Sequence, residues 1–185
     1  MDFIPALQDP GEIWDRVPAT WDEWEQWATA LEAMRLDGNF LAAEGLIVAR
    51  LKSRFTDPVQ VLTAADIRGA KSLAQWCPAV FVMFDGYQVV ATPDGKANRG
   101  AAQMVDQLWT CVCAVRSAAD PISGSAVRVD AGALLDTLTK ALLGWQPNTQ
   151  FRWMQLRNAP KPNIADGVGY FPMSFTTRCT LQGEP

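Results

Sequence analysis

The stretch "QLWTCVCAVRSA", residues 107–118, alternates two sets of side chains in the manner of a β-strand. One face takes Gln107, Trp109, Cys111, Cys113 and Val115, and the other takes Leu108, Thr110, Val112, Ala114 and Arg116. Both faces are largely apolar, and strands of this kind are usually buried on both faces of their sheet. We therefore predict a long central strand over residues 102–118, covered on both sides.

Strand patterns also occur before and after this segment. Residues 79–84 and 87–92 flank Asp85-Gly86, and two central residues of this type favour a hairpin turn. Further strands are expected at residues 59–62, near residues 150–157 and at residues 169–181. The last two are separated by "NAPKPNIADGVG", residues 158–169, which is rich in loop-forming residues.

Two principal helices are expected to cover the sheet. The first lies in "NFLAAEGLIVARLKSRF", residues 39–55, where apolar residues recur at helical spacing. Asp130 is expected to cap the second. Its apolar face is formed by Leu134, Leu135, Leu138, Ala141 and Leu142. A brief helix is also expected, capped by Thr63 with Asp66 and reaching about Gln75. The pattern predicts an α+β fold, with a mostly antiparallel sheet covered by two principal helices.

Charge divides the chain into an N-terminal arm and a body. Residues 1–38 hold nine acidic and two basic residues, a balance of −7. Residues 39–185 hold the other eleven acidic and fourteen basic residues, a balance of +3, and the two sum to −4. The shift coincides with "DGN" at residues 37–39. We therefore predict an acidic, Trp-rich helical arm over 1–38 and an α+β body over 39–185.

The arm contains "TWDEWEQWATALEAM", residues 20–34, whose capping pattern predicts a helix over residues 21–36. Its apolar side carries Trp21, Trp24, Trp27 and Leu31. A membrane-surface helix favours basic residues on its polar face, whereas this polar face is acidic. The helix either packs on its own body or docks on a neighbouring subunit or partner. We assign these four residues to partner binding.

Composition excludes most catalytic chemistry. The chain has no histidine, which rules out Ser-His-Asp and Cys-His pairs and every histidine-dependent metal site. Its four cysteines are Cys77, Cys111, Cys113 and Cys179, and they form no pair of CxxC motifs. The carboxylates of the body sit at turns and helix starts, and no glycine-rich phosphate-binding motif occurs. We predict that the protein is not an enzyme and binds no cofactor or metal.

Two further features concern location and partners. No apolar run is long enough to span a bilayer, and the N-terminus has no basic n-region, so we expect a cytoplasmic protein with reduced cysteines and no membrane partner. Residues 92–101 and 158–169 are longer than sheet connections require. They carry Lys96, Arg99 and Lys161, which we assign to partner binding as rim charges. The alternative is a pair of ordinary surface loops.

Five segments resemble, in order, the tail terminator proteins of tailed bacteriophages. They are "AEGLIVARLKSRF", "CPAVFVMFDG", "QLWTCVCAVRS", "ALLGWQP" and "YFPMSFTT". The resemblance covers roughly residues 40 to 182 and rests on packing and turn residues. These are Pro78-Ala79-Val80, Gln107-x-Trp109, Leu143-Gly144-Trp145 with Pro147, and Tyr170-x-Pro172. The first 38 residues lie outside the resemblance, and their Trp-rich helix departs from the family pattern.

The resemblance implies a structural virion protein without catalytic residues. Its expected partners are copies of itself in a hexameric ring, the tail tube protein and the head–tail connector protein, with DNA only passing through the lumen. Its expected location is the virion tail at the head–tail junction, after synthesis in the host cytoplasm. Two alternatives are a monomeric adaptor or inhibitor-type binding protein that uses the Trp-rich helix, and a small carboxylate-dependent hydrolase.

Overall fold

The computed structural model describes residues 35–36, 38–66, 73–90, 102–116, 125–165 and 167–183. In chain order its elements are α3 (Ala42–Lys52), β1 (Gln60–Thr63), the 3-10 helix η1 (Leu73–Trp76), β2 (Ala79–Val89), β3 (Ala102–Arg116), α4 (Ser125–Leu142), β4 (Gln155–Arg157), β5 (Asn163–Ala165) and β6 (Val168–Gln182). The strands form one sheet in the order β1-β2-β3-β6-β4, with β5 also paired to β6. Only the β1–β2 pair is parallel among these strands, so the predicted α+β class with a mostly antiparallel sheet is confirmed.

The long strand predicted from the alternating pattern is β3, and it lies in the centre of the sheet. It pairs with β2 on one side and with β6 on the other. The β3–β6 ladder runs without interruption from Ala102 opposite Gln182 to Arg116 opposite Val168. A strand flanked on both sides has all its backbone groups available for ladder hydrogen bonds, so β3 anchors the sheet.

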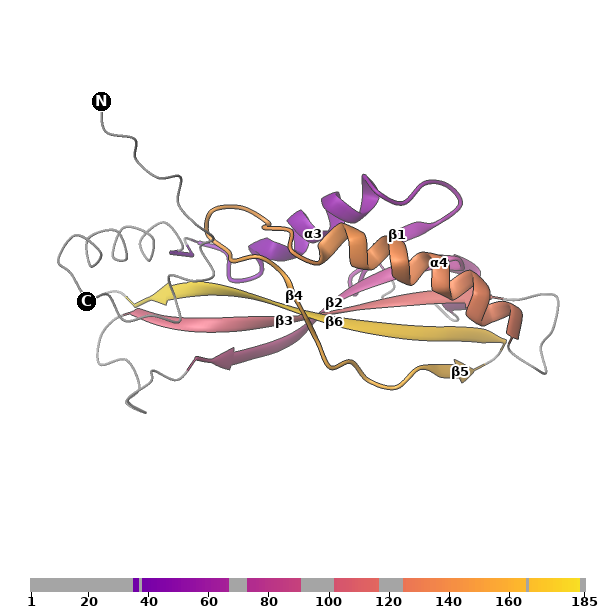
Figure 1. The fold of residues 1–185 in the computed structure, drawn as a ribbon. Coiled ribbons are helices and arrows are strands. Elements are labelled where there is room, and N and C mark those ends of the chain that lie inside the picture. Colours follow the sequence, from indigo (N-terminus) through magenta and orange to yellow (C-terminus); the bar gives the residue numbers. More distant parts are fainter. Residues whose placement is uncertain are drawn as a thin grey trace, which may run out of the picture.

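Both principal helices lie on the same face of the sheet, above it in Figure 1. This face carries Trp109 and Phe175, which are opposite each other on β3 and β6 and fully buried. Helix residues Ile47 and Leu138 belong to the same core cluster. Large apolar side chains release the most surface from water when covered, which explains why both helices pack here.

The opposite face has a smaller apolar cluster of its own. Its buried members are Ala79, Phe81, Ala114 and Val168. Trp76 of η1 packs against this cluster, together with Tyr170 of β6. Among the described residues, the second face of β3 is therefore covered by the short 3-10 helix η1 and not by a principal helix.

The predicted hairpin at Asp85-Gly86 is wrong, because β2 runs straight through these residues. Phe84 pairs with Trp109 and Tyr87 pairs with Gln107, so β2 holds one more residue than β3 across this step. The result is a β-bulge, and Gly86 takes a φ of 100° within it. A glycine with positive φ serves a bulge as well as a hairpin turn, which is why the local sequence misled the prediction.

Several predicted boundaries also change. Asp130 lies inside α4, which begins earlier, at Ser125. The expected strand near residues 150–157 is confined to β4. The loop expected at residues 158–169 contains β5, which pairs with the start of β6. Gly167, with a φ of 74°, allows the tight reversal between β5 and β6.

One predicted cap near the start of the body, formed by Thr63 and Asp66, can be compared with its prediction. Thr63 donates its backbone N–H (2.7 Å) and its hydroxyl (2.9 Å) to Asp66 Oδ2, as expected for this pair. These bonds lower the pKa of Asp66 because they favour its charged form, the backbone bond more than the hydroxyl. The brief helix expected to follow is a turn at residues 64–66, residues 67–72 lie outside the described residues, and a 3-10 helix occupies Leu73–Trp76. Helix α3 is confirmed, and Asn39 Oδ1 accepts the backbone N–H of Leu41 (2.9 Å) just before it.

The predicted arm helix over residues 21–36 does not extend to its expected end. Arg35 forms a parallel bridge with Thr180, and the backbone N–H of Leu36 donates to the carbonyl of Thr180 (2.9 Å). These two residues therefore bind the outer edge of β6, where an unpaired backbone would otherwise remain. Residues 21–34, which hold the rest of the predicted helix, lie outside the described residues.

The bulge gives the first testable prediction. Gly86→Ala should lower the free energy of unfolding by about 1–2 kcal/mol, because a side chain disfavours positive φ. Gly45→Ala is the matched control: Gly45 lies in α3, and no atom lies within 4 Å of a Cβ added at either position. The control should raise stability by about 0.5–1 kcal/mol through helix propensity. Chemical denaturation of both variants measures the difference, and equal stabilities would contradict the role of φ.

Candidate interaction surfaces

Three of the four cysteines, Cys111, Cys113 and Cys179, are buried, and Cys77 is half-buried. Burial raises the pKa of Cys113 to about 12. Burial and the neighbouring Asp106 charge raise the pKa of Cys179 to about 12, and burial raises the pKa of Cys111 further. Thiols with such pKa values stay protonated near neutrality and are poor nucleophiles. They pack in the core as small apolar side chains.

Neither a metal cluster nor a membrane-spanning helix is found in the part of the chain that the structure describes. No three His, Cys, Asp or Glu side chains gather there in a way that could hold a metal ion. No helix within the described ranges is long and apolar enough to cross a bilayer.

A charged group lies on the sheet face opposite the helices. Arg178 of β6 holds Asp106 of β3 with two hydrogen bonds, Nε to Oδ1 at 2.7 Å and Nη2 to Oδ2 at 3.1 Å. Arg157 of β4 places its Nη2 3.7 Å from the same Oδ2. Two arginines and one carboxylate leave this group with a net positive charge, and its exposed end is Arg157.

A second polar group joins the three longest strands on the same face. The Thr110 hydroxyl donates to Asp85 Oδ2 (3.2 Å) and also shares a hydrogen bond with the Ser174 hydroxyl (2.9 Å). Thr110 and Ser174 are buried, whereas Asp85 is exposed at the bulge of β2. The bond to Thr110 therefore ties the bulge carboxylate to the centre of the sheet.

The first exposed surface is the end of β2. Strand β1 pairs with β2 only as far as Val82, and no described strand pairs with residues 83–89 on that side; we call these residues the β2 edge. Tyr87 is 54% exposed and Val89 is 55% exposed. Phe40 supports the Tyr87 ring edge to face, with 5.5 Å between ring centroids. The β2 edge is thus an ordered strand that presents apolar side chains to solvent.

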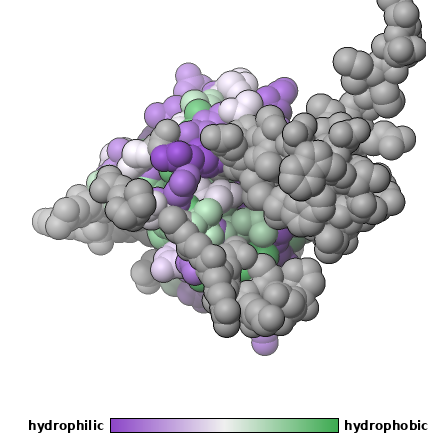
Figure 2. Space-filling view, turned by 90° about the vertical axis from the view of Figure 1, so that its left-hand side faces the viewer, coloured by the Kyte–Doolittle hydropathy of each residue, from purple (hydrophilic) through white to green (hydrophobic). Residues whose placement is uncertain are grey.

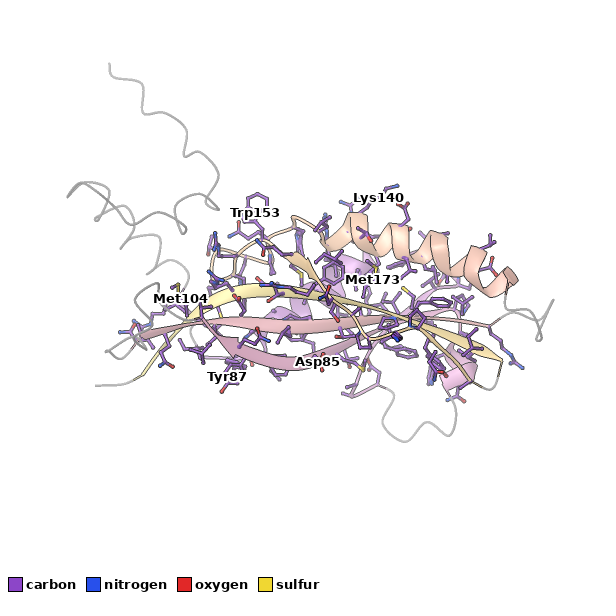
Figure 3. The ribbon with its side chains drawn as sticks, turned by 60° about the horizontal axis from the view of Figure 1, so that its bottom comes forward. Asp85, Tyr87, Met104, Lys140, Trp153 and Met173 are labelled. Atoms are coloured by element: carbon purple, nitrogen blue, oxygen red, sulfur yellow. The ribbon has the colours of Figure 1, made fainter. Side chains whose placement is uncertain are left out.

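The pictures place this surface at one end of the molecule. Strand β2 finishes at the left in Figure 1. Figure 2 views the molecule from that side and shows hydrophobic residues exposed near the centre of the view. Figure 3 shows Asp85 and Tyr87 along one strand, on the side away from α4 and its Lys140.

The second exposed surface lies on the other side of the sheet. It consists of residues 155–165, which include β4 and β5 and are exposed throughout; we call it the β4–β5 edge. Leu156 is 47% exposed and Ile164 is 52% exposed. Trp153, which precedes β4, is 42% exposed and projects in Figure 3 from the side opposite Tyr87.

The predicted partner-binding residues are only partly placed by the structure. Lys161 is exposed within the β4–β5 edge. Trp21, Trp24, Trp27, Leu31, Lys96 and Arg99 lie outside the described residues, so their roles stay predictions. The sequence reasoning missed both edges. The sequence carried no direct signal for the β2 edge, because the edge depends on which strand pairs with β2 and on where that pairing ends.

The charged group gives a second prediction. Asp106→Ala should lower the free energy of unfolding by about 2 kcal/mol, because it leaves the half-buried Arg178 without its carboxylate. Asp136→Ala is the control: Asp136 pairs with Lys140 at the same 2.7 Å, but its side chain is 60% exposed, against 13% for Asp106. The Asp136→Ala substitution should lower the free energy of unfolding by about 0.5 kcal/mol or less. Chemical denaturation at low and high salt measures the loss of stability in each variant. Similar losses for Asp106→Ala and Asp136→Ala would contradict the prediction.

Comparison with known proteins identifies the family. The family model described as phage tail terminator protein matches residues 37–185. No curated protein matches the chain. A chain of the solved structure described as the virion of a native gene transfer agent particle is similar to it, with a TM-score of 0.36 and 17% identity, covering 76% of this chain and 88% of that chain. Because the family match spans most of its length, the chain belongs to the phage tail terminator family and is a structural protein of the virion tail.

Proposed function

We propose that this chain forms a homo-oligomeric ring, a hexamer, that caps the finished tail tube and joins it to the head–tail connector. The observation that carries the proposal is the family match over residues 37–185. The open β2 and β4–β5 edges support it, because natural sheets seldom leave ordered apolar edges in solvent. A protein with such edges is suited to assembly.

DNA passes through the lumen of this ring without being held. Strong binding to the phosphate backbone requires several basic side chains acting together. The body carries a balance of only +3, and Arg178 is already engaged by Asp106. These features suit a passage better than a binding site. We also propose a purely structural role without catalysis, consistent with the buried, protonated thiols of the core.

The acidic arm over residues 1–38 is proposed to dock on a neighbouring subunit or on a partner, with Trp21, Trp24, Trp27 and Leu31 as its contacts. Large aromatic side chains dominate the energetics of protein interfaces, and three tryptophans near one another suit this role. The body over residues 39–185 carries the sheet and both described helices. Lys96, Arg99 and Lys161 are proposed to contact the tube or the connector.

Mass measurement tests the ring directly. Native mass spectrometry of the full chain, alone and bound to purified tail tubes, should show six copies per ring. Imaging of intact particles should place the ring between the tube and the connector. A single copy in both states and in particles would overturn the proposal and favour an adaptor.

The arm gives a third prediction. Deleting residues 1–34 keeps Arg35 and Leu36, which hydrogen-bond to β6 at Thr180. The truncated chain should retain the far-UV circular dichroism of the body but assemble about tenfold less well, because clustered tryptophans carry much interface energy. Sedimentation velocity measures assembly. Loss of the folded body would instead show that the tryptophans belong to its core.

The rim charges give a fourth prediction. Reversal of Lys96, Arg99 and Lys161 to Glu should leave the free energy of unfolding nearly unchanged but weaken attachment of rings to tubes by about threefold to tenfold, since rim charges guide register more than affinity. The matched control reverses Lys52, Arg54 and Lys140, which are exposed on other parts of the body. Tube co-sedimentation compares the two. Equal losses of tube binding in the two triple variants would show that attachment depends on total charge and not on these three positions.

A further inference from the structure

We infer that neighbouring copies in the ring contact each other head to tail, with the β2 edge of one copy against the β4–β5 edge of the next. The inference rests on the ring proposed above and names the surfaces that close it. Cyclic assemblies with more than two members need two different, complementary surfaces on each copy. The sheet order β1-β2-β3-β6-β4 puts these two edges on opposite sides of one rigid sheet.

The backbone of the β2 edge is ready to accept another strand. The backbone N–H of Val90 donates to the carbonyl of Met104 (3.0 Å), so Val90 directs its backbone groups toward β3. Hydrogen-bonding direction alternates along an antiparallel strand. Tyr87 and Val89 therefore direct theirs away from β3, to the side where no described strand lies. Strands β4 and β5 of the next copy are exposed and can pair with this edge, whereas residues 158–162 between them, with Lys161, stay available for the tube or the connector.

Apolar side chains occur on both surfaces. Tyr87 and Val89 are more than half exposed on the β2 edge, and Leu156 and Ile164 are about half exposed on the β4–β5 edge. The Tyr87 ring is held by Phe40, which itself packs against Phe84, so its position is fixed before any partner arrives. Contact between the edges removes all four side chains from water and adds a hydrophobic gain to the backbone hydrogen bonds.

Charge on the two surfaces is complementary. Asp85 is the charged residue of the β2 edge, and Thr110 holds its carboxylate at the bulge. Arg157 is the exposed arginine of the β4–β5 edge. Its own neighbour Asp106 is already engaged twice by Arg178, so Arg157 keeps a surplus positive charge for an acid on the next copy. Opposite charges on the two edges favour this pairing over contacts between like edges.

Cross-linking in assembled tails tests the contact. The double variants Val89→Cys with Leu156→Cys and Val89→Cys with Ile164→Cys cover both directions in which the edges can run. A short bis-maleimide should join copies into a ladder of chains up to ring size in at least one of them. Both double variants and their controls, the parent chain and the three single variants, carry Cys77→Ser, because Cys77 is the native thiol that is not buried. The controls should give no ladder, since the three remaining native thiols are buried and protonated.

A second pair of variants tests the contact between the two edges without cross-linking. Val89→Arg should reduce the yield of rings by about tenfold, because it places a bulky charge in an apolar contact. Val129→Arg, at a valine that is 75% exposed on α4, should leave the yield within about twofold of wild type. Far-UV circular dichroism confirms that both variants are folded.

The outcomes separate this inference from the ring itself. Wild-type rings in particles, without cross-links in either double variant, would overturn the edge contact and leave the ring standing. Equal ring yields for Val89→Arg and Val129→Arg would overturn it as well, and would assign the β2 edge to another occupant such as residues 1–34 or the tail tube. Absence of rings in wild-type particles would overturn the proposed function.

Discussion

Every residue of β3 from Ala102 to Arg116 faces a residue of β6, and this ladder holds the two longest strands in a single register. A shift of one residue between them would turn all their side chains to the wrong face. The register puts Trp109 beside Phe175 under the helices and Asp106 opposite Arg178 on the other face. The core, the charged group and the position of the β4–β5 edge, whose strands pair with β6, depend on this one pairing.

The sequence predicted those elements whose signal is periodic and long. Strand β3 was predicted because its two faces alternate over many residues, and α3 because its apolar residues recur at helical spacing. The bulge at Asp85-Gly86 was missed because its recognition depends on which strand lies alongside, and that partner is distant in sequence. Strand β5 was missed because three exposed residues carry no pattern and are fixed only by pairing with β6.

The candidate surfaces were harder to predict than the fold. Exposure of Lys161 followed from its place among loop-forming residues. The β2 edge arises from a difference in length between neighbouring strands, and the charged group joins Asp106 to arginines from two later strands. Such features exist only once the chain is folded, so no local window of sequence contains them. They nevertheless use ordinary residues, and chemistry alone would not have singled them out.

The outer side of β6 is shared by three separate pieces of chain: β5 opposite residues 168–170, β4 opposite residues 174–176, and Arg35 at Thr180. Residues 158–162 join β4 to β5, residues 38–41 lead toward α3 after Arg35 and Leu36, and neither segment is a helix or a strand. Insertions or deletions in those joining segments shift only the local chain path, whereas a single insertion in β6 would disturb all three attachments and the ladder with β3. Related proteins can therefore diverge in length around this strand far more freely than within it.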